Sequence, residues 1–165
     1  MTEESVANAE GVDFALVAYR EEGIWQLEEL SAEMVADVEA FARELRRWPG
    51  DGGSLGLVSV DEDFFVLVRV AGEDMRVLLS DVTAATDWPI ARSAVNHLEI
   101  PLADDEDDPV PAGDLAIVED LGMGAMDMGA LLDDFDLYPD EMLGDIAERI
   151  GFGKLYDETL GVTTS

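Results

Sequence analysis

The sequence Leu55–Asp81, LGLVSVDEDFFVLVRVAGEDMRVLLSD, is the most strongly patterned part of the chain. Three short runs rich in Val, Leu and Phe are separated there by two acidic turns. Runs of about 5 to 8 such residues, bounded by Asp, Glu and Gly, predict an antiparallel meander. The middle run, 64–70, is apolar on both alternating faces except at Arg69, which predicts a central strand with little solvent on either face. The other elements are expected to pack on this sheet.

A hairpin and a helix are expected before the meander. Residues 13–20 and 23–27 predict two strands around the turn 20–23, because Gly23 supplies the positive φ that a tight turn requires. A helix is expected to begin at Ser31, a good N-cap residue, and to end before Pro49. Its apolar side chains recur at spacings of three and four, as in a helix that lies on a sheet. They are Met34, Val38, Phe41, Leu45 and Trp48.

The second half of the chain changes character. Residues 88–98 predict a helix with Pro89 at its first position. Residues 99–113, EIPLADDEDDPVPAG, carry three prolines, five consecutive acids and no apolar period, which predicts a linker. Residues 114–160 have helical patterns, and Gly151 with Phe152 resembles the end of a helix in a Schellman motif.

The fold class predicted from these patterns is α+β. We expect an antiparallel sheet of about five strands, in the order strand-strand-helix-strand-strand-strand-helix, with helices on one face and a small all-helical C-terminal domain appended. The predicted parts are an acidic disordered tail (1–12), the α+β domain (13–98), the acidic linker (99–113), the helical domain (114–160) and a frayed tail (161–165).

The composition restricts the function. In 165 residues, 39 acids against 9 bases give a formal charge of −30, which repels phosphates and anionic lipid and attracts basic surfaces. We therefore expect a basic protein partner and no direct nucleic-acid binding; a generally acidic, halophilic proteome is the alternative source of this charge. The absence of cysteine excludes disulfides, thiolate zinc sites and cysteine nucleophiles. No apolar run approaches the roughly 20 residues of a membrane helix, and no leader is visible, so a cytoplasmic location is expected.

The acidic run in the linker invites a test for a calcium loop. That loop needs Gly at position 6 and Glu at position 12, but counting from Asp104 these positions hold Pro109 and Leu115. We interpret the run as a self-repelling spacer or as a docking segment for a basic partner. The possible partner contacts are Asp104, Asp105, Glu106, Asp107 and Asp108.

Two arginines of the meander are expected to face each other. If 71–74 is a four-residue hairpin loop, Val70 pairs with Met75 and Arg69 lies opposite Arg76, which costs stability unless anions lie beside them. We expect these anions to be the protein's own carboxylates. The alternative is that Arg69 and Arg76 contact a bound anion.

No other pattern predicts chemistry. The single histidine, His97, has no partner marked by spacing, and the chain lacks nucleophile, P-loop and dinucleotide motifs. The methionines of 122–129 are expected to fill a helical core, with a pliable binding surface as the alternative. We therefore predict no catalytic residue, no metal and no cofactor.

Three segments resemble a known family, the acidic actinobacterial tRNA adenosine deaminase-associated proteins. They are 76–81 (RVLLSD), 111–114 (PAGD) and 136–152 (DLYPDEMLGDIAERIGF), and the resemblance spans about 12–160. It implies an association, inferred from gene neighbourhood, with the enzyme that makes inosine in tRNA. The resemblance implies no catalytic residues at any position of this sequence.

The His and Cys content excludes the interpretation that this chain is itself the deaminase. A tRNA adenosine deaminase holds zinc with His and two Cys and moves a proton with Glu, whereas this chain has one His and no Cys. The expected function is that of a non-enzymatic accessory or regulatory protein that binds a basic partner, with the deaminase as first candidate. The alternatives are an acidic nucleic-acid mimic, and a small-anion-binding domain or enzyme that uses the Arg69 and Arg76 face.

Overall fold

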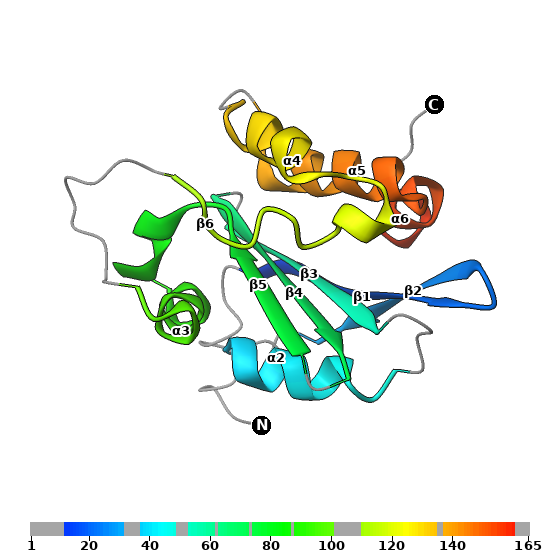
Figure 1. The fold of residues 1–165 in the computed structure, drawn as a ribbon, viewed down its shortest axis with the longest axis horizontal. Helices are drawn as coiled ribbons and strands as arrows, with labels where there is room; N and C mark the ends of the chain where they lie inside the picture. The colour runs from blue at the N-terminus through cyan, green and yellow to red at the C-terminus, as the bar shows by residue number, and fades with distance from the viewer. Residues whose placement is uncertain are drawn as a thin grey trace.

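A computed structural model describes residues 12–31, 37–48, 53–61, 63–72, 74–86, 88–100, 110–134 and 137–160. Its centre is an antiparallel sheet in the order β2-β1-β3-β4-β5-β6 (Figure 1). The strands are β1 (Val12–Glu21), β2 (Ile24–Leu30), β3 (Ser54–Val60), β4 (Phe64–Ala71), β5 (Asp74–Leu79) and β6 (Ala112–Gly113). The predicted α+β class and the meander β3-β4-β5 are confirmed.

The sixth strand comes from residues that the sequence assigned to the linker. Ala112 pairs with Leu79 and Gly113 with Leu78. A Cβ on Gly113 would lie 2.2 Å from the carbonyl oxygen of Val77, so only glycine allows this close approach. A strand of two residues is too short to show an alternating pattern, which explains why it was missed.

Two helices lie against one face of the sheet, α2 (Val38–Leu45) and α3 (Pro89–Leu98), the latter after the 3₁₀ helix η2 (Val82–Thr86). The side chain of Asp37 accepts a hydrogen bond of 2.7 Å from the amide of Ala40. Asp37 rather than Ser31 is therefore the N-cap of α2. Met34 lies outside the described residues, and Val38, Phe41 and Leu45 are fully buried as predicted.

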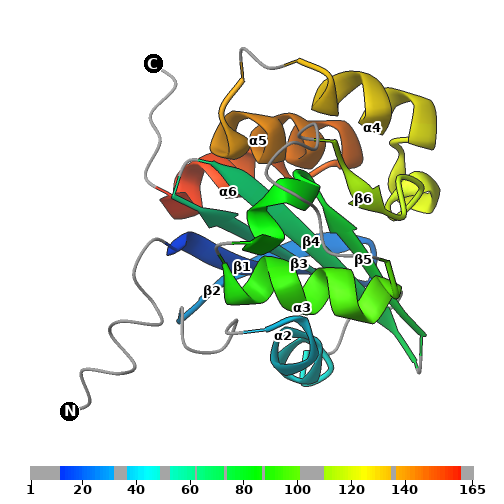
Figure 2. The same ribbon diagram turned by 90° about the vertical axis from the view of Figure 1, so that its left-hand side faces the viewer.

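The opposite face is covered by the C-terminal helices (Figures 1 and 2). These are η3 (Glu119–Leu121), α4 (Ala125–Leu132), α5 (Pro139–Ile150) and α6 (Gly153–Leu160). Beneath them lie fully buried strand residues: Leu16, Leu57, Phe65, Leu67 and Leu78. The expectation that the helices of residues 13–98 lie on one face is confirmed by α2 and α3. The opposite face is also apolar, and the C-terminal helices cover it.

The C-terminal helices thus form the second layer of the protein. We call η3, α4, α5 and α6 the C-terminal layer. Its residues share one core with the sheet, and whether 13–98 and 114–160 are separate domains stays a prediction. Residues 1–11, 101–109 and 161–165, on which the predicted tails and most of the linker fall, lie outside the described residues. No helix in the described ranges has the length and apolarity to cross a membrane.

Candidate functional site: the arginine pair and its carboxylates

Arg69 and Arg76 lie directly opposite each other on β4 and β5, in the predicted register. Arg69 is buried, and its guanidinium binds both carboxylate oxygens of Asp120 in η3, with 2.9 Å between Nη2 and Oδ2. Its Nη1 also donates a hydrogen bond of 3.0 Å to the carbonyl oxygen of Ile117. Such a bidentate geometry fixes both the position and the orientation of the guanidinium.

Arg76 has a looser partner. Its Nε lies 3.4 Å from Oδ2 of Asp114, and the two side chains are 51% and 37% exposed. Ion pairs this exposed contribute little to stability. The other oxygen of Asp114 accepts a hydrogen bond of 2.9 Å from the amide of Ala116, which holds the carboxylate in place. The chain after β6 therefore brings one carboxylate to each arginine.

The ion pair with Arg69 changes the acidity of Asp120. The hydrogen bond from Arg69 lowers the pKa of Asp120 below its ordinary value, and the charge of Arg76 acts in the same direction. Partial burial acts against this but does not reverse it. Asp120 is therefore ionised at neutral pH and compensates the buried charge of Arg69.

A surface pocket of about 320 Å³ lies beside this pair. It is lined by Arg69, Ala71, Asp74, Arg76, Ala116, Glu119 and Asp120. Two guanidinium groups therefore share the pocket with three carboxylates, so its lining is not positive overall. The carboxylates beside both arginines are the protein's own; contact with an external anion stays a prediction.

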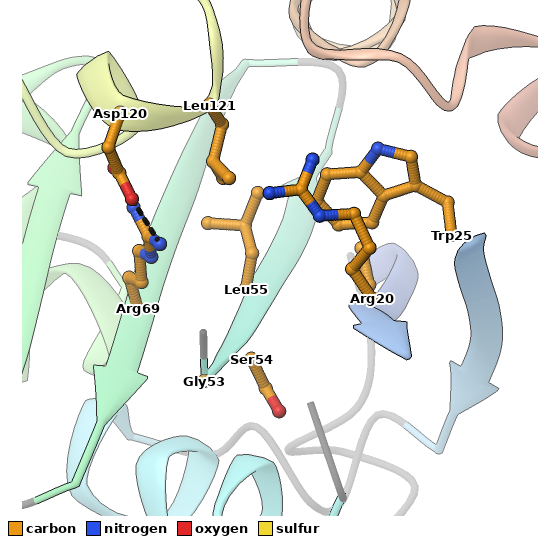
Figure 3. A pocket seen from close by; sticks show the side chains of 9 residues that line it. Arg20, Trp25, Gly53, Ser54, Leu55, Arg69, Asp120 and Leu121 are labelled. Atoms are coloured by element: carbon orange, nitrogen blue, oxygen red, sulfur yellow. Dashed lines mark hydrogen bonds and ion pairs between the residues drawn. The ribbon is translucent and has the colours of Figure 1, made fainter. Parts of the chain in front are cut away.

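A second, smaller pocket of about 50 Å³ reaches Arg69 from the side of β1 and β2 (Figure 3). The guanidinium of Arg20 lies over the ring of Trp25, 5.1 Å from its centroid, in a cation–π contact. Figure 3 shows Leu55 and Leu121 between Arg20 and Arg69. Sequence reasoning did not identify Arg20 or Trp25. The signal was present, since a two-residue turn at Glu22 and Gly23 pairs Arg20 with Trp25.

The other residues considered from the sequence lie elsewhere. Asp104, Asp105, Glu106, Asp107 and Asp108 fall outside the described residues, so their partner contact stays a prediction. Nδ1 of His97 lies 3.7 Å from a carboxylate oxygen of Glu39 and joins α3 to α2. Met123 and Met128 are fully buried, as expected of core residues, whereas Met126 is 89% exposed.

The described residues contain no group of three or more His, Asp or Glu side chains arranged to hold a metal ion. The pocket beside Arg69 and Arg76 is lined by these two cations and by three carboxylates, one of which, Asp120, is paired with Arg69. This arrangement can hold the C-terminal layer against β4 and β5.

Comparison with known proteins identifies the family. The family described as Rv3753c-like tRNA adenosine deaminase-associated protein matches residues 13–153. Protein Rv3753c of Mycobacterium tuberculosis (strain ATCC 25618 / H37Rv) is 42% identical over 142 residues, which cover 84% of this chain and 82% of that protein. No solved structure matches. Because the match runs from β1 to the start of α6, the chain belongs to the Rv3753c-like tRNA adenosine deaminase-associated protein family.

Proposed function

We propose that this protein is a non-enzymatic accessory or regulatory protein that binds a basic protein partner, with tRNA adenosine deaminase as the first candidate. The observation that carries the proposal is the family match over residues 13–153, whose description names an association with that enzyme. A cytoplasmic location is part of the proposal.

The charge supports a basic partner. If each of the 9 bases neutralised one acid, 30 of the 39 acids would still be uncompensated. A field of this size steers a positively charged protein toward the surface and raises the rate of association. A deaminase that handles tRNA needs a basic surface, and a strongly acidic protein is complementary to such a surface.

The arginine site supports an accessory role. A substrate-binding arginine pair needs donors directed at the substrate, but Arg69 directs its donors at Asp120 and Ile117. Arg76 has Asp114 beside it. The chain also has no Cys, whereas a tRNA adenosine deaminase holds zinc with His and two Cys.

The test is retention of purified tRNA adenosine deaminase by the immobilised chain. We expect retention at about 50 mM salt and weaker retention at about 300 mM, because salt screens the attraction between surface charges. An unrelated protein of the same positive charge serves as control and should be retained less. Absence of the deaminase at both salt concentrations would contradict the proposal.

A second candidate is a small-anion site at Arg69 and Arg76, which the adjacent pocket of about 320 Å³ favours. Its test is a thermal-shift screen with phosphate, citrate and nucleoside phosphates. A ligand at 100 times its dissociation constant adds about 2.7 kcal/mol to the free energy of unfolding. A shift that disappears in Arg76→Gln would support this candidate, and no shift with any anion would remove it.

A further inference from the structure

Among the described strands, one long strand has an edge that no other strand pairs with. β2 pairs with β1 and lies at the end of the strand order, whereas the opposite end of the sheet is the two-residue strand β6. Seven residues, Ile24–Leu30, therefore run along an edge that no other described strand pairs with. A free edge of this length is a template for another strand.

The hairpin turn determines which backbone groups point outward. Glu22 and Gly23 form a two-residue turn, so Glu21 and Ile24 are the first hydrogen-bonded pair of β1 and β2. Hydrogen-bonded and non-hydrogen-bonded pairs alternate along an antiparallel ladder. The N–H and C=O groups of Trp25, Leu27 and Glu29 consequently point away from β1, toward the free edge.

The strand is anchored on one side. The indole Nε1 of Trp25 donates a hydrogen bond of 3.2 Å to the carbonyl oxygen of Ile150, and its ring lies 5.0 Å from that of Phe152. Both contacts tie β2 to the C-terminal layer. Leu30, at the end of the strand, is buried. An incoming strand would therefore meet an edge that is already ordered, which lowers the entropic cost of binding.

The negative charge near this edge favours a positively charged segment as its binding partner. Glu28 and Glu29 are exposed on β2, Glu22 is exposed in the turn, and Glu21 ends β1. We propose that the free edge of β2 is the docking site for an extended, Lys- or Arg-rich segment of the partner protein, which adds a seventh strand to the sheet. This inference rests on the proposed function and names the surface that carries it. A second copy of the chain fits worse, because it would bring like charges together across the edge.

The first test removes one outward N–H. Glu29→Pro deletes the amide that faces the free edge without deleting a β1–β2 hydrogen bond, and proline is tolerated in an edge strand at such a position. Glu29→Gln removes the charge and keeps the amide. We expect Glu29→Pro to weaken binding of the deaminase about tenfold, as for the loss of roughly one main-chain hydrogen bond and a charge contact, and Glu29→Gln to weaken it less.

The second test examines the charge. We expect the pair Glu28→Gln with Glu29→Gln to reduce the association rate and its dependence on salt. Its matched control is Asp127→Asn with Asp133→Asn, which removes the same charge from two exposed positions, one in α4 and one at its C-cap. The control should bind as the unmodified chain does.

A measurement on the unmodified chain covers the case in which Glu29→Pro does not fold. Amide hydrogen exchange should be fast at Leu27 and Glu29 in the free protein and slow in the complex. The amides of Gln26 and Glu28, which face β1, should be protected in both states.

The outcomes separate the two proposals. If the unmodified chain does not retain the deaminase, the proposed function and the docking edge fail together. If it retains the deaminase but Glu29→Pro binds equally well and Leu27 gains no protection, the docking edge alone is wrong. If the variant with Glu28→Gln and Glu29→Gln dimerises and still binds the deaminase, the two glutamates serve only to prevent self-association through this edge. That result would overturn the inference.

Discussion

At the level of single residues, the position of Arg69 is unusual, because its buried charge depends on a carboxylate that is mostly in solvent. The side chain of Arg69 is 9% exposed and that of Asp120 is 62% exposed. Removing the carboxylate takes the bidentate partner away from a buried guanidinium, which keeps its hydrogen bond to the carbonyl oxygen of Ile117. The cost is moderated because water reaches the site from the side of Asp120.

We therefore expect Asp120→Asn to lower the free energy of unfolding by about 1 kcal/mol, measured by urea denaturation at pH 7. Asp127→Asn on α4 is the matched control, because Asp127 is exposed, and should change the free energy by less than about 0.5 kcal/mol. Equal effects of the two substitutions would show that the pair with Arg69 does not stabilise the fold.

The same carboxylate predicts a dependence on pH. Because the pKa of Asp120 is lower in the folded protein than the ordinary value of 3.8, its contribution to stability is fully present above pH 3.8. The contribution is lost as the pH falls through the lowered pKa. Other carboxylates titrate in the same range, so the quantity to measure is the difference in stability between the unmodified chain and Asp120→Asn. This difference should shrink below about pH 4; a constant difference would contradict the assignment.

A third residue-level prediction concerns Gly56 in β3. A Cβ at this position would lie 2.3 Å from the ring of Phe41, which is fully buried in α2. We expect Gly56→Ala to lower the free energy of unfolding by about 1 to 3 kcal/mol, because the ring must move within a packed core. Combining it with Phe41→Leu should recover part of this loss. As control, Gly129→Ala in α4 meets side-chain atoms only at 3.9 Å and should be neutral or slightly stabilising.

At the level of elements, the end of α5 joins the C-terminal layer to the sheet. Gly151 has a φ of 117°, and the amides of Gly151 and Phe152 both donate to the carbonyl oxygen of Ala147, at 2.9 and 2.8 Å. The turn directs Phe152 into the core, where it is 1% exposed and contacts Trp25 of β2. The helix end predicted from Gly151 and Phe152 is thus confirmed, and it positions the residue that closes the layer.

We expect Phe152→Ala to lower the free energy of unfolding by about 3 to 5 kcal/mol, as is usual for a buried phenylalanine. Trp25 fluorescence should change as well, since the indole loses its neighbouring ring. Leu155→Ala in α6 is a milder comparison, because Leu155 is only partly buried. A loss below about 1 kcal/mol for Phe152→Ala would show that the C-terminal layer is held mainly by other contacts.

At the level of the whole molecule, one sheet contributes side chains to two hydrophobic cores, one on each of its faces. The residues of β1, β3, β4 and β5 alternate between the core beneath α2 and α3 and the core beneath the C-terminal layer. Removing the second layer would expose large apolar side chains, among them Phe65 and Leu67. Two parts that share such a surface are expected to unfold together.

We therefore expect a single unfolding transition for the full chain. Trp48 and Trp88 report on the core beneath α2 and α3, and Trp25 reports on the core beneath the C-terminal layer. We would compare one variant that keeps only Trp25 with one that keeps only Trp48 and Trp88. In each variant, the midpoint in urea from fluorescence should equal the midpoint from far-UV circular dichroism of the same variant. Separate midpoints would instead support two independent domains, as the boundaries 13–98 and 114–160 predicted.

The sequence by itself determined the meander, the opposed arginines, the end of α5 and the family. Each depends on neighbours in the chain: alternating side chains, the length of a turn, a glycine after a helix, or a run of matching residues. It also determined the large negative charge, which needs no fold. Only the tertiary structure decided that the C-terminal layer covers the second face of the sheet and that Asp120 and Asp114 reach Arg69 and Arg76. It also decided that β2 is the outermost of the described strands at its end of the sheet. The contacts that create this arrangement join residues about 40 to 125 positions apart, such as Arg69 and Asp120 or Trp25 and Ile150. Local sequence patterns carry no information on which distant segments meet.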